Sequence, residues 1–169
     1  GLVNELKMLT DKLDLDIYEI IRAASTKPFG FVPFYPGPGL GGHCIPIDPV
    51  FIKWIAKKNG AKANFIDLAR KTNINISEWI INEICKREKK IRNKKLLKKI
   101  FIIGMAYKKD VNDTRESPSI KIYKKLINFN NIIDFHDDKV KQLTINKKIL
   151  FSKPLNHCSK YDYVILCTA

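Results

Sequence analysis

A loop rich in glycine and proline, residues 36–49 (PGPGLGGHCIPIDP), constrains this sequence more than any other segment. Four glycines and two prolines fall within residues 36–42, and a segment of this composition forms neither a helix nor an ordinary strand. Its backbone can approach a ligand closely, because glycine carries no side chain. The sequence therefore predicts a fixed loop that delivers Cys44 at its end.

Cys44 is the residue of this loop best suited to chemistry. Asp48 and Pro49 predict a helix start, with the Asp48 carboxylate as N-cap and Pro49 at the first helical position. A helix N-terminus favours a thiolate, which is the form of cysteine that attacks carbonyl carbons. We therefore predict a nucleophilic Cys44 that faces a bound substrate. His43 invites a thiol–imidazole pair, but adjacent side chains usually diverge, so we do not expect one.

The other three cysteines give no sign of a shared site. Cys85, Cys158 and Cys167 show no CxxC spacing and no secretory context, so we expect neither disulfides nor a metal site. Cys85 and Cys167 fall in apolar patterns typical of core positions, whereas the pattern around Cys158 leaves its place open.

The net charge of +14 invites a nucleic-acid hypothesis, but its distribution argues against one. Residues 86–99 hold nine basic residues and one acid, so most of the excess lies in one short segment. Only five of the 31 basic residues are arginine, and the abundance of lysine is typical of an AT-rich coding sequence. A solvated helix end and linker explains the segment better. We therefore expect no nucleic-acid partner.

No apolar stretch reaches the length needed to span a membrane, which is about 20 residues. The chain also opens directly in an amphipathic pattern, without the features of a secretory signal. We expect a cytoplasmic protein without a membrane partner.

The apolar pattern has helical spacing through the first ninety residues and turns into short strand-like runs from Ile100 onward. In the predicted helix after Asp48, we expect Phe51, Trp54 and Ile55 to point inward. The predicted helices cover residues 2–13, 16–24, 48–60, 65–90 and 117–129, with a weaker one near 140–143, and the predicted strands cover 100–103, 132–135 and 163–167. A strand, a helix and a strand in this order predict a parallel sheet.

Two motifs in this order resemble one family. The run PGPGLGGHCIPIDP and the later GMAYKKDVNDTRESPS (residues 104–119) are similar to nucleotide-sugar dehydrogenases of the UDP-glucose/GDP-mannose dehydrogenase family. The preceding KPFGFVPFYPGP is similar to members that act on UDP-N-acetylhexosamines, especially UDP-N-acetylglucosamine. The resemblance implies NAD-dependent oxidation of the C6 alcohol of a UDP-hexosamine or UDP-hexose to a carboxylate, for surface polysaccharide synthesis.

The fold class that we expect is therefore α/β. The resemblance implies a central helical dimerisation domain over residues 1–90, a basic linker over 91–98 and a partial Rossmann-like domain that binds the UDP-sugar over 99–169. The resemblance also implies a homodimer through the helical domain.

The resemblance also assigns roles around the loop. It makes Cys44 the nucleophile that forms a thiohemiacetal and then a thioester, and Asp48 the carboxylate that helps to position a lysine and a water. Tyr35, Gly41 and Gly42 would contact the substrate. Aromatic packing explains Tyr35 about as well, and turn geometry alone explains the glycines.

In the second motif, the resemblance gives Lys108 a contact with the UDP-sugar. It gives Arg115 a contact with NAD, and Lys109 is a weaker candidate for the same cleft. A solvated basic loop is the alternative for all three. Asp137 stands where Rossmann sheets carry an acid that binds ribose, but we assign it no role toward NAD.

The sequence contains no GxGxxG, and the family's upstream lysine and asparagine would precede Gly1. We therefore expect a fragment of a dehydrogenase that is inactive alone. The alternative is a truncated remnant that only dimerises or binds nucleotide.

Overall fold

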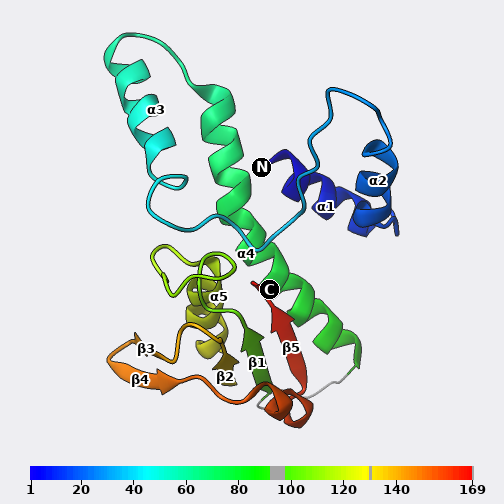
Figure 1. Cartoon of the computed structure of the whole chain (residues 1–169), viewed down its shortest axis with the longest axis vertical. Helices are drawn as coiled ribbons and strands as arrows, with labels where there is room; N and C mark the ends of the chain where they lie inside the picture. Colours follow the sequence, from blue (N-terminus) through cyan, green and yellow to red (C-terminus); the bar gives the residue numbers. More distant parts are fainter. Residues whose placement is uncertain (92–97, 130, 169) are drawn as a thin grey trace.

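The computed structural model describes residues 1–91, 98–129 and 131–168, with side chains omitted for 88–91. The chain forms a helical half and an α/β half, and one long helix, α4, runs through both (Figure 1). The helices of the first half are α1 Leu2–Lys12, α2 Ile17–Ala24, α3 Asp48–Lys58 and α4 Asn64–Ile91. The predicted helices in this half are therefore confirmed in number and order.

The α/β half contains a parallel sheet in the order β2-β1-β5. Its strands are β1 Lys99–Ile103, β2 Ile132–His136 and β5 Tyr163–Leu166, and α5 Pro118–Ile127 connects β1 to β2. This is the expected βαβ arrangement, and the α/β fold class is confirmed. The carboxyl ends of β1 and β5 point toward the helical half, so the loop after β1 lies at the junction of the two halves (Figure 1).

The core of this half lies between the sheet, α5 and the second part of α4. Ile81 of α4 and Ile122 and Leu126 of α5 are buried against Ile100 and Ile102 of β1. Because α4 also packs against α1 and α3, it joins the helical half to the sheet. Residues 92–97, most of the predicted linker, lie outside the described residues. Lys98 is buried, so the expected solvation of the basic segment is wrong at that position.

The weak helix predicted near residues 140–143 is wrong, because the segment forms an antiparallel hairpin of β3 Gln142–Ile145 and β4 Lys148–Phe151. Leu143 and Ile145 are buried while Thr144 between them is exposed, which is strand periodicity. Asn146 and Lys147 form the turn with φ of 50° and 64°, values typical of a two-residue hairpin loop. A short 3-10 helix, η1 Leu155–Lys160, precedes β5.

The start and the inward face of α3 differ from the sequence prediction. Asp48 is the first helical residue, Ile47 occupies the N-cap position, and no side chain caps the helix. Phe51, Trp54 and Ile55 are exposed by 61%, 59% and 53%, because no other described element covers this face. The helical spacing of the apolar residues therefore identified the apolar face of α3 correctly, but the prediction that this face points inward was wrong.

Candidate functional site

The glycine-rich loop is docked onto the segment that follows β1. The backbone N–H of Gly42 donates to the carbonyl of Arg115 at 2.9 Å. A Cβ atom on Gly41 would lie 2.5 Å from the Cβ of Tyr107, and one on Gly42 would lie 2.7 Å from the Tyr107 ring. Gly42 also has a φ of +91°, which side-chain-bearing residues rarely adopt. The two glycines are therefore required by the packing of one motif on the other.

Cys44 follows this docked pair and precedes the first turn of α3. Its carbonyl accepts hydrogen bonds from the N–H groups of Ile47 at 3.0 Å and Asp48 at 2.8 Å, so the backbone bends at the cysteine. The Cys44 thiol is exposed. The Nδ1 atom of His43 lies 3.7 Å from Sγ of Cys44. The expectation that these neighbouring side chains diverge is therefore wrong, because the bend turns both to one side.

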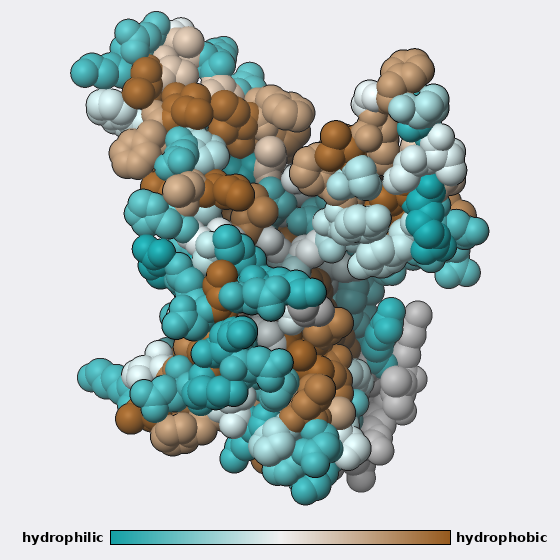
Figure 2. Space-filling model, viewed as in Figure 1, coloured by the Kyte–Doolittle hydropathy of each residue, from teal (hydrophilic) through white to brown (hydrophobic). Residues whose placement is uncertain are grey.

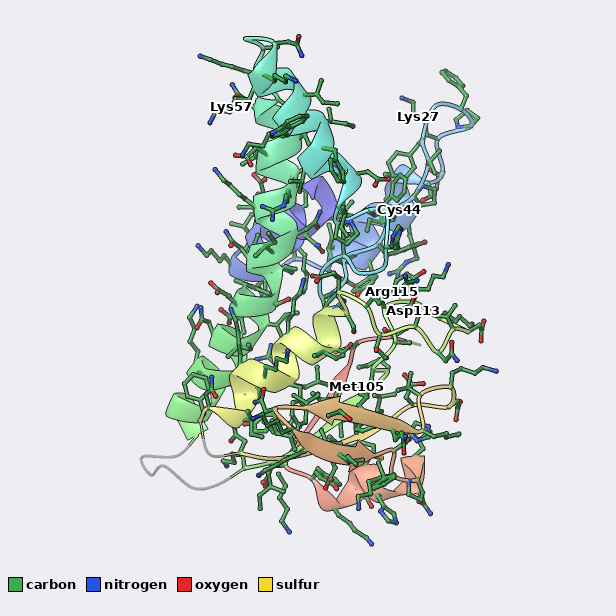
Figure 3. All side chains as sticks on the ribbon, turned by 90° about the vertical axis from the view of Figure 1, so that its left-hand side faces the viewer. Lys27, Cys44, Lys57, Met105, Asp113 and Arg115 are labelled. Atoms are coloured by element: carbon green, nitrogen blue, oxygen red, sulfur yellow. The ribbon has the colours of Figure 1, made fainter. Side chains whose placement is uncertain are left out.

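Arg115 and Asp113 form a tight pair at the same junction (Figure 3). Arg115 Nε donates to both carboxylate oxygens of Asp113 at 3.1 and 2.9 Å, and Nη2 donates to Oδ2 at 2.6 Å. These hydrogen bonds from Arg115 lower the pKa of Asp113 to about 2, and the Asp113 carboxylate also interacts electrostatically with His43. The pair with Asp113 raises the pKa of Arg115, which also interacts electrostatically with Cys44.

The remaining predicted residues are distributed around this junction. Lys108 is exposed, and its Nζ lies 5.4 Å from the centroid of the Tyr107 ring. Lys109 is also exposed, in the same loop. Tyr35 stacks on Tyr18 of α2, with the ring centroids 6.3 Å apart, so its described ring contact is with the helical half.

Asp137 at the end of β2 holds the loop that carries Lys108. One carboxylate oxygen accepts the N–H groups of Met105 at 2.7 Å and Ala106 at 3.0 Å, and the other accepts those of Lys139 and Val140 at 2.8 Å each. Burial alone would raise the pKa of Asp137, but these four hydrogen bonds outweigh it and hold the pKa below its usual range. Asp137 was singled out in the sequence by its place after a strand, but the role of its carboxylate in holding the loop after β1 was not predicted.

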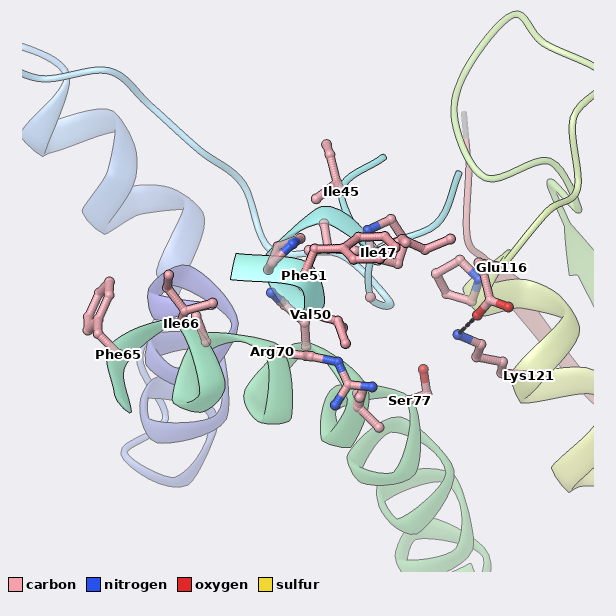
Figure 4. Close-up of a pocket in the computed structure, with 18 residues that line it drawn as sticks. Ile45, Ile47, Val50, Phe51, Phe65, Ile66, Arg70, Ser77, Glu116 and Lys121 are labelled. Carbon is pink, nitrogen blue, oxygen red and sulfur yellow. Dashed lines mark hydrogen bonds and ion pairs between the residues drawn. The ribbon is translucent and has the colours of Figure 1, made fainter. Parts of the chain in front are cut away.

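An apolar hollow of about 570 Å³ lies beside the junction, between the start of α3, α4 and the start of α5 (Figure 4). Val50 and Phe51 line it from α3, and Arg70 lines it from α4. Glu116 and Lys121 close one end through an ion pair of 2.7 Å. Cys44 is not among its lining residues, so this hollow is distinct from the surroundings of the thiol.

Within residues 1–91, 98–129 and 131–168, no three histidine, cysteine, aspartate or glutamate side chains are grouped so that they could hold a metal ion. Over the same ranges, no helix has both the length and the apolar character needed to cross a bilayer.

Two models of one known family together match most of this chain. A model of the central domain of the UDP-glucose/GDP-mannose dehydrogenase family matches residues 1–75, and a model of the UDP binding domain of the same family matches residues 101–169. The chain belongs to the UDP-glucose/GDP-mannose dehydrogenase family. The docked loop therefore belongs to the part of the chain that matches the central domain, and Tyr107 and Arg115 belong to the part that matches the UDP binding domain.

Relatives within the family carry the same segments. A UDP-N-acetyl-D-mannosamine dehydrogenase of Campylobacter jejuni is 40% identical over 127 residues, covering 75% of this chain and 29% of its own length. A UDP-N-acetyl-D-glucosamine 6-dehydrogenase of Pseudomonas aeruginosa is 28% identical over 137 residues, covering 81% of this chain and 32% of its own length. The chain thus spans about 30% of the length of the curated relatives that it matches.

Solved structures show the same fold. A UDP-D-ManNAc dehydrogenase from Pyrococcus horikoshii superimposes with a TM-score of 0.82 at 26% identity, covering 99% of this chain and 37% of that chain. An NDP-N-acetyl-D-galactosaminuronic acid dehydrogenase from Methanosarcina mazei gives a TM-score of 0.84 at 20% identity over the same share of this chain. The Rossmann-like parallel sheet and the helical half are thus arranged as in dehydrogenases of this family.

Proposed function

We propose that this chain is the part of an NAD-dependent nucleotide-sugar 6-dehydrogenase that carries the nucleophile and binds the UDP-sugar. The enzyme would oxidise the C6 alcohol of a UDP-N-acetylhexosamine to a carboxylate, for surface polysaccharide synthesis. The observation that carries the proposal is the docking of the Cys44 loop on the Tyr107–Arg115 segment. This docking places the exposed thiol of Cys44 and the exposed ammonium of Lys108 on two segments that pack against each other.

The chemistry at Cys44 follows from the oxidation state of the substrate. The aldehyde that forms at C6 is attacked by the Cys44 sulfur, and a C–S bond forms while the carbonyl oxygen becomes a hydroxyl. Oxidation of this thiohemiacetal gives a thioester, which water hydrolyses to the carboxylate while the thiol is regenerated. Asp48 begins α3 four residues after the nucleophile, a position from which we propose that it orients the attacking water.

Arg115 and Lys109 fit one edge of the NAD site. The Arg115 side chain is 65% exposed despite its pair with Asp113, so its outer edge is open to an anionic group such as a diphosphate. When bound, NAD accepts the hydrides that the oxidation of the alcohol and of the thiohemiacetal releases. Arg115 and Lys109 would position the diphosphate at the junction, while Lys108, whose Nζ lies 5.4 Å from the centroid of the Tyr107 ring, would hold the UDP-sugar.

The sugar belongs to the N-acetylhexosamine class in this proposal. The relative from Campylobacter jejuni is named for UDP-N-acetyl-D-mannosamine and is 40% identical, whereas the relative named for UDP-N-acetyl-D-glucosamine is 28% identical. The higher identity favours the manno configuration over the gluco configuration that the loop resemblance suggested. The two sugars differ only at C2, so they are compared directly in the experiment below.

Replacing Lys108 by alanine is expected to weaken the binding of both UDP-sugars by at least about tenfold, since a charge-assisted hydrogen bond is worth about 1.5–3 kcal/mol. Amide chemical shifts during titration with UDP-N-acetylmannosamine and UDP-N-acetylglucosamine measure the affinity, which we expect to be millimolar. Lys147→Ala, on the exposed turn of the β3–β4 hairpin, removes the same charge as a matched control.

Arg115→Ala is expected to change UDP-sugar affinity little, because its proposed partner is NAD. Equal losses in Lys108→Ala, Arg115→Ala and the Lys147→Ala control would show a general electrostatic attraction and contradict the assignment of Lys108.

We also propose that the helical half forms a homodimer. The chain has a solvent-accessible area of 11939 Å², whereas a compact monomer of its mass exposes about 8,500 Å². Exposed apolar side chains gather over α3, the upper part of α4 and the segment after α2 (Figure 2). The excess belongs to one protomer, and twice its value exceeds the roughly 2,000–5,000 Å² that an obligate interface buries over both partners, so a dimer interface would account for part of it.

Sedimentation velocity over a wide range of concentrations tests the dimer, which we expect to persist at micromolar protein. Trp54→Glu places a charge on the exposed face of α3 and is expected to shift the chain to monomer. Lys57→Glu changes charge on the same helix without removing apolar area, and it is expected to leave the dimer intact. A monodisperse wild-type monomer at every concentration would remove the proposal.

A further inference from the structure

The imidazole of His43 has a position that the proposed chemistry does not yet use. Its Nδ1 atom lies 3.7 Å from Sγ of Cys44, a separation at which a thiol and a ring nitrogen can share a hydrogen because sulfur is a large atom. A nucleophile and a base that contact each other are the signature of an activated thiol, and such contacts are often long before substrate binds.

The backbone holds this pair on both sides. Before it, the N–H of Gly42 is bonded to the carbonyl of Arg115. After it, the carbonyl of Cys44 accepts the N–H groups of Ile47 and Asp48. The chain therefore bends across His43 and Cys44, and the pair is held against the loop after β1.

The charged groups that face the pair are arranged with opposite signs. The carboxylate of Asp113 interacts electrostatically with His43, and the guanidinium of Arg115 interacts electrostatically with Cys44. Tyr107 interacts electrostatically with Arg115, and the Lys108 ammonium lies 5.4 Å from the centroid of the Tyr107 ring. An anion beside the imidazole and a cation beside the sulfur both favour movement of a proton from the thiol to the ring.

We infer that His43 accepts the thiol proton of Cys44 and so generates the attacking thiolate of the proposed dehydrogenase. The S–H bond breaks, the proton moves to Nδ1, and the electron pair stays on sulfur to form the C–S bond. Arg115 donates hydrogen bonds to the Asp113 carboxylate, so Asp113 stabilises the imidazolium through its negative charge and not through a direct hydrogen bond. The inference rests on the proposed function for its substrate, but the proton transfer itself needs neither UDP-sugar nor NAD.

The alkylation rate of Cys44 between pH 5.5 and 9.5 tests this inference on the whole chain. His43→Asn keeps a polar atom near the position of Nδ1 but accepts no proton in this range. The reagent is iodoacetamide. The Cys44 sulfur forms a bond to its carbon while iodide leaves, so the alkylation rate is proportional to the fraction of Cys44 present as thiolate. Peptide mapping assigns the label to Cys44.

We expect the wild type to be alkylated at least about tenfold faster than His43→Asn at pH 6.5, because an unassisted thiol ionises only near pH 8.5. At pH 9.5 the two rates are expected to be equal, or the variant faster, since both thiols are then ionised. His157→Asn, in η1, is the matched control and should follow the wild-type profile. Thiolate absorbance at 240 nm should show the same differences without any reagent.

A wild-type pH profile in His43→Asn would overturn the inference, and so would a loss in His43→Ala that His43→Asn restores, because both outcomes indicate a spacing role. Circular dichroism shows whether the variants fold, which is expected because His43 is exposed. If the wild type does not bind UDP-sugar but His43→Asn still changes the pH dependence of Cys44 alkylation, only the proposed function is contradicted. If the wild type binds UDP-sugar and His43→Asn alkylates with the wild-type pH dependence, only the role of His43 is contradicted.

Discussion

Asp137→Ala is expected to lower the free energy of unfolding by about 3–5 kcal/mol, because the buried carboxylate accepts four backbone hydrogen bonds. Each N–H left without a partner in a buried position costs about 1–3 kcal/mol, and the losses are not additive. A domain of this size is stable by about 5–15 kcal/mol, so the variant would lose a large part of that free energy of unfolding. Urea titration followed by circular dichroism measures the change.

Asp138→Ala is the matched control for this prediction. The Asp138 side chain is 84% exposed, and its Oδ1 atom lies 3.4 Å from Nε2 of His136. We expect the control to change stability by less than about 0.5 kcal/mol, as exposed ion pairs contribute little. A similar loss in both variants would contradict the role given to Asp137.

The same carboxylate predicts how stability depends on pH. A group whose pKa is lowered in the folded state contributes stability above its unfolded pKa, and that contribution is lost as the pH falls through the folded pKa. For Asp137 the pKa is lowered from 3.8, so the loss is expected below about pH 4. Asp137→Asn should remove this part of the acid dependence, and an unchanged acid dependence would show that other carboxylates account for it.

Gly42→Val is expected to destabilise the chain by about 3 kcal/mol and to separate the two motifs. The new Cβ would meet the Tyr107 ring at 2.7 Å, and a β-branched residue is strained at a φ of +91°. The melting temperature should fall by about 6–12 °C. Since the loop would lose its bond to Arg115, the affinity for UDP-sugar should also fall.

Gly37→Val is the control for this variant. Nothing lies within 4 Å of a Cβ built on Gly37, and its φ is outside the left-handed region. Unchanged melting and binding in this control, together with losses in Gly42→Val, would support the docking of the loop on Tyr107. A neutral Gly42→Val would contradict it.

Elements with a long or unbroken apolar pattern could be predicted from the sequence. The 28 residues of α4 and the apolar run of β1 have one consistent period each, so local pattern and tertiary packing agree. The β3–β4 hairpin was missed because each strand has four residues, too few for the period of two to stand out. The exposed face of α3 was misassigned because periodicity identifies apolar residues and says nothing about what covers them.

The candidate site shows the same limit. Cys44 was identified because its loop composition is local information. The His43–Cys44 contact depends on the bond between Gly42 and Arg115, residues 73 positions apart, which no local pattern contains. The pair Gly41-Gly42 was itself a signal, since adjacent glycines often mark a close approach, but it could not name Tyr107 as the neighbour.

The central claim is that the Cys44 thiol and Lys108 face one UDP-sugar. Cys44 is exposed, whereas the other three thiols are partly covered, and burial raises the pKa of Cys167 to about 11. The decisive measurement is limiting alkylation with peptide mapping, with and without UDP-N-acetylmannosamine at a concentration that saturates the chemical shifts. We expect that Cys44 is labelled first, that the UDP-sugar slows its labelling, and that Lys108→Ala removes this protection. Preferential labelling of Cys158 or Cys85, or an unchanged Cys44 rate with the UDP-sugar bound, would contradict it.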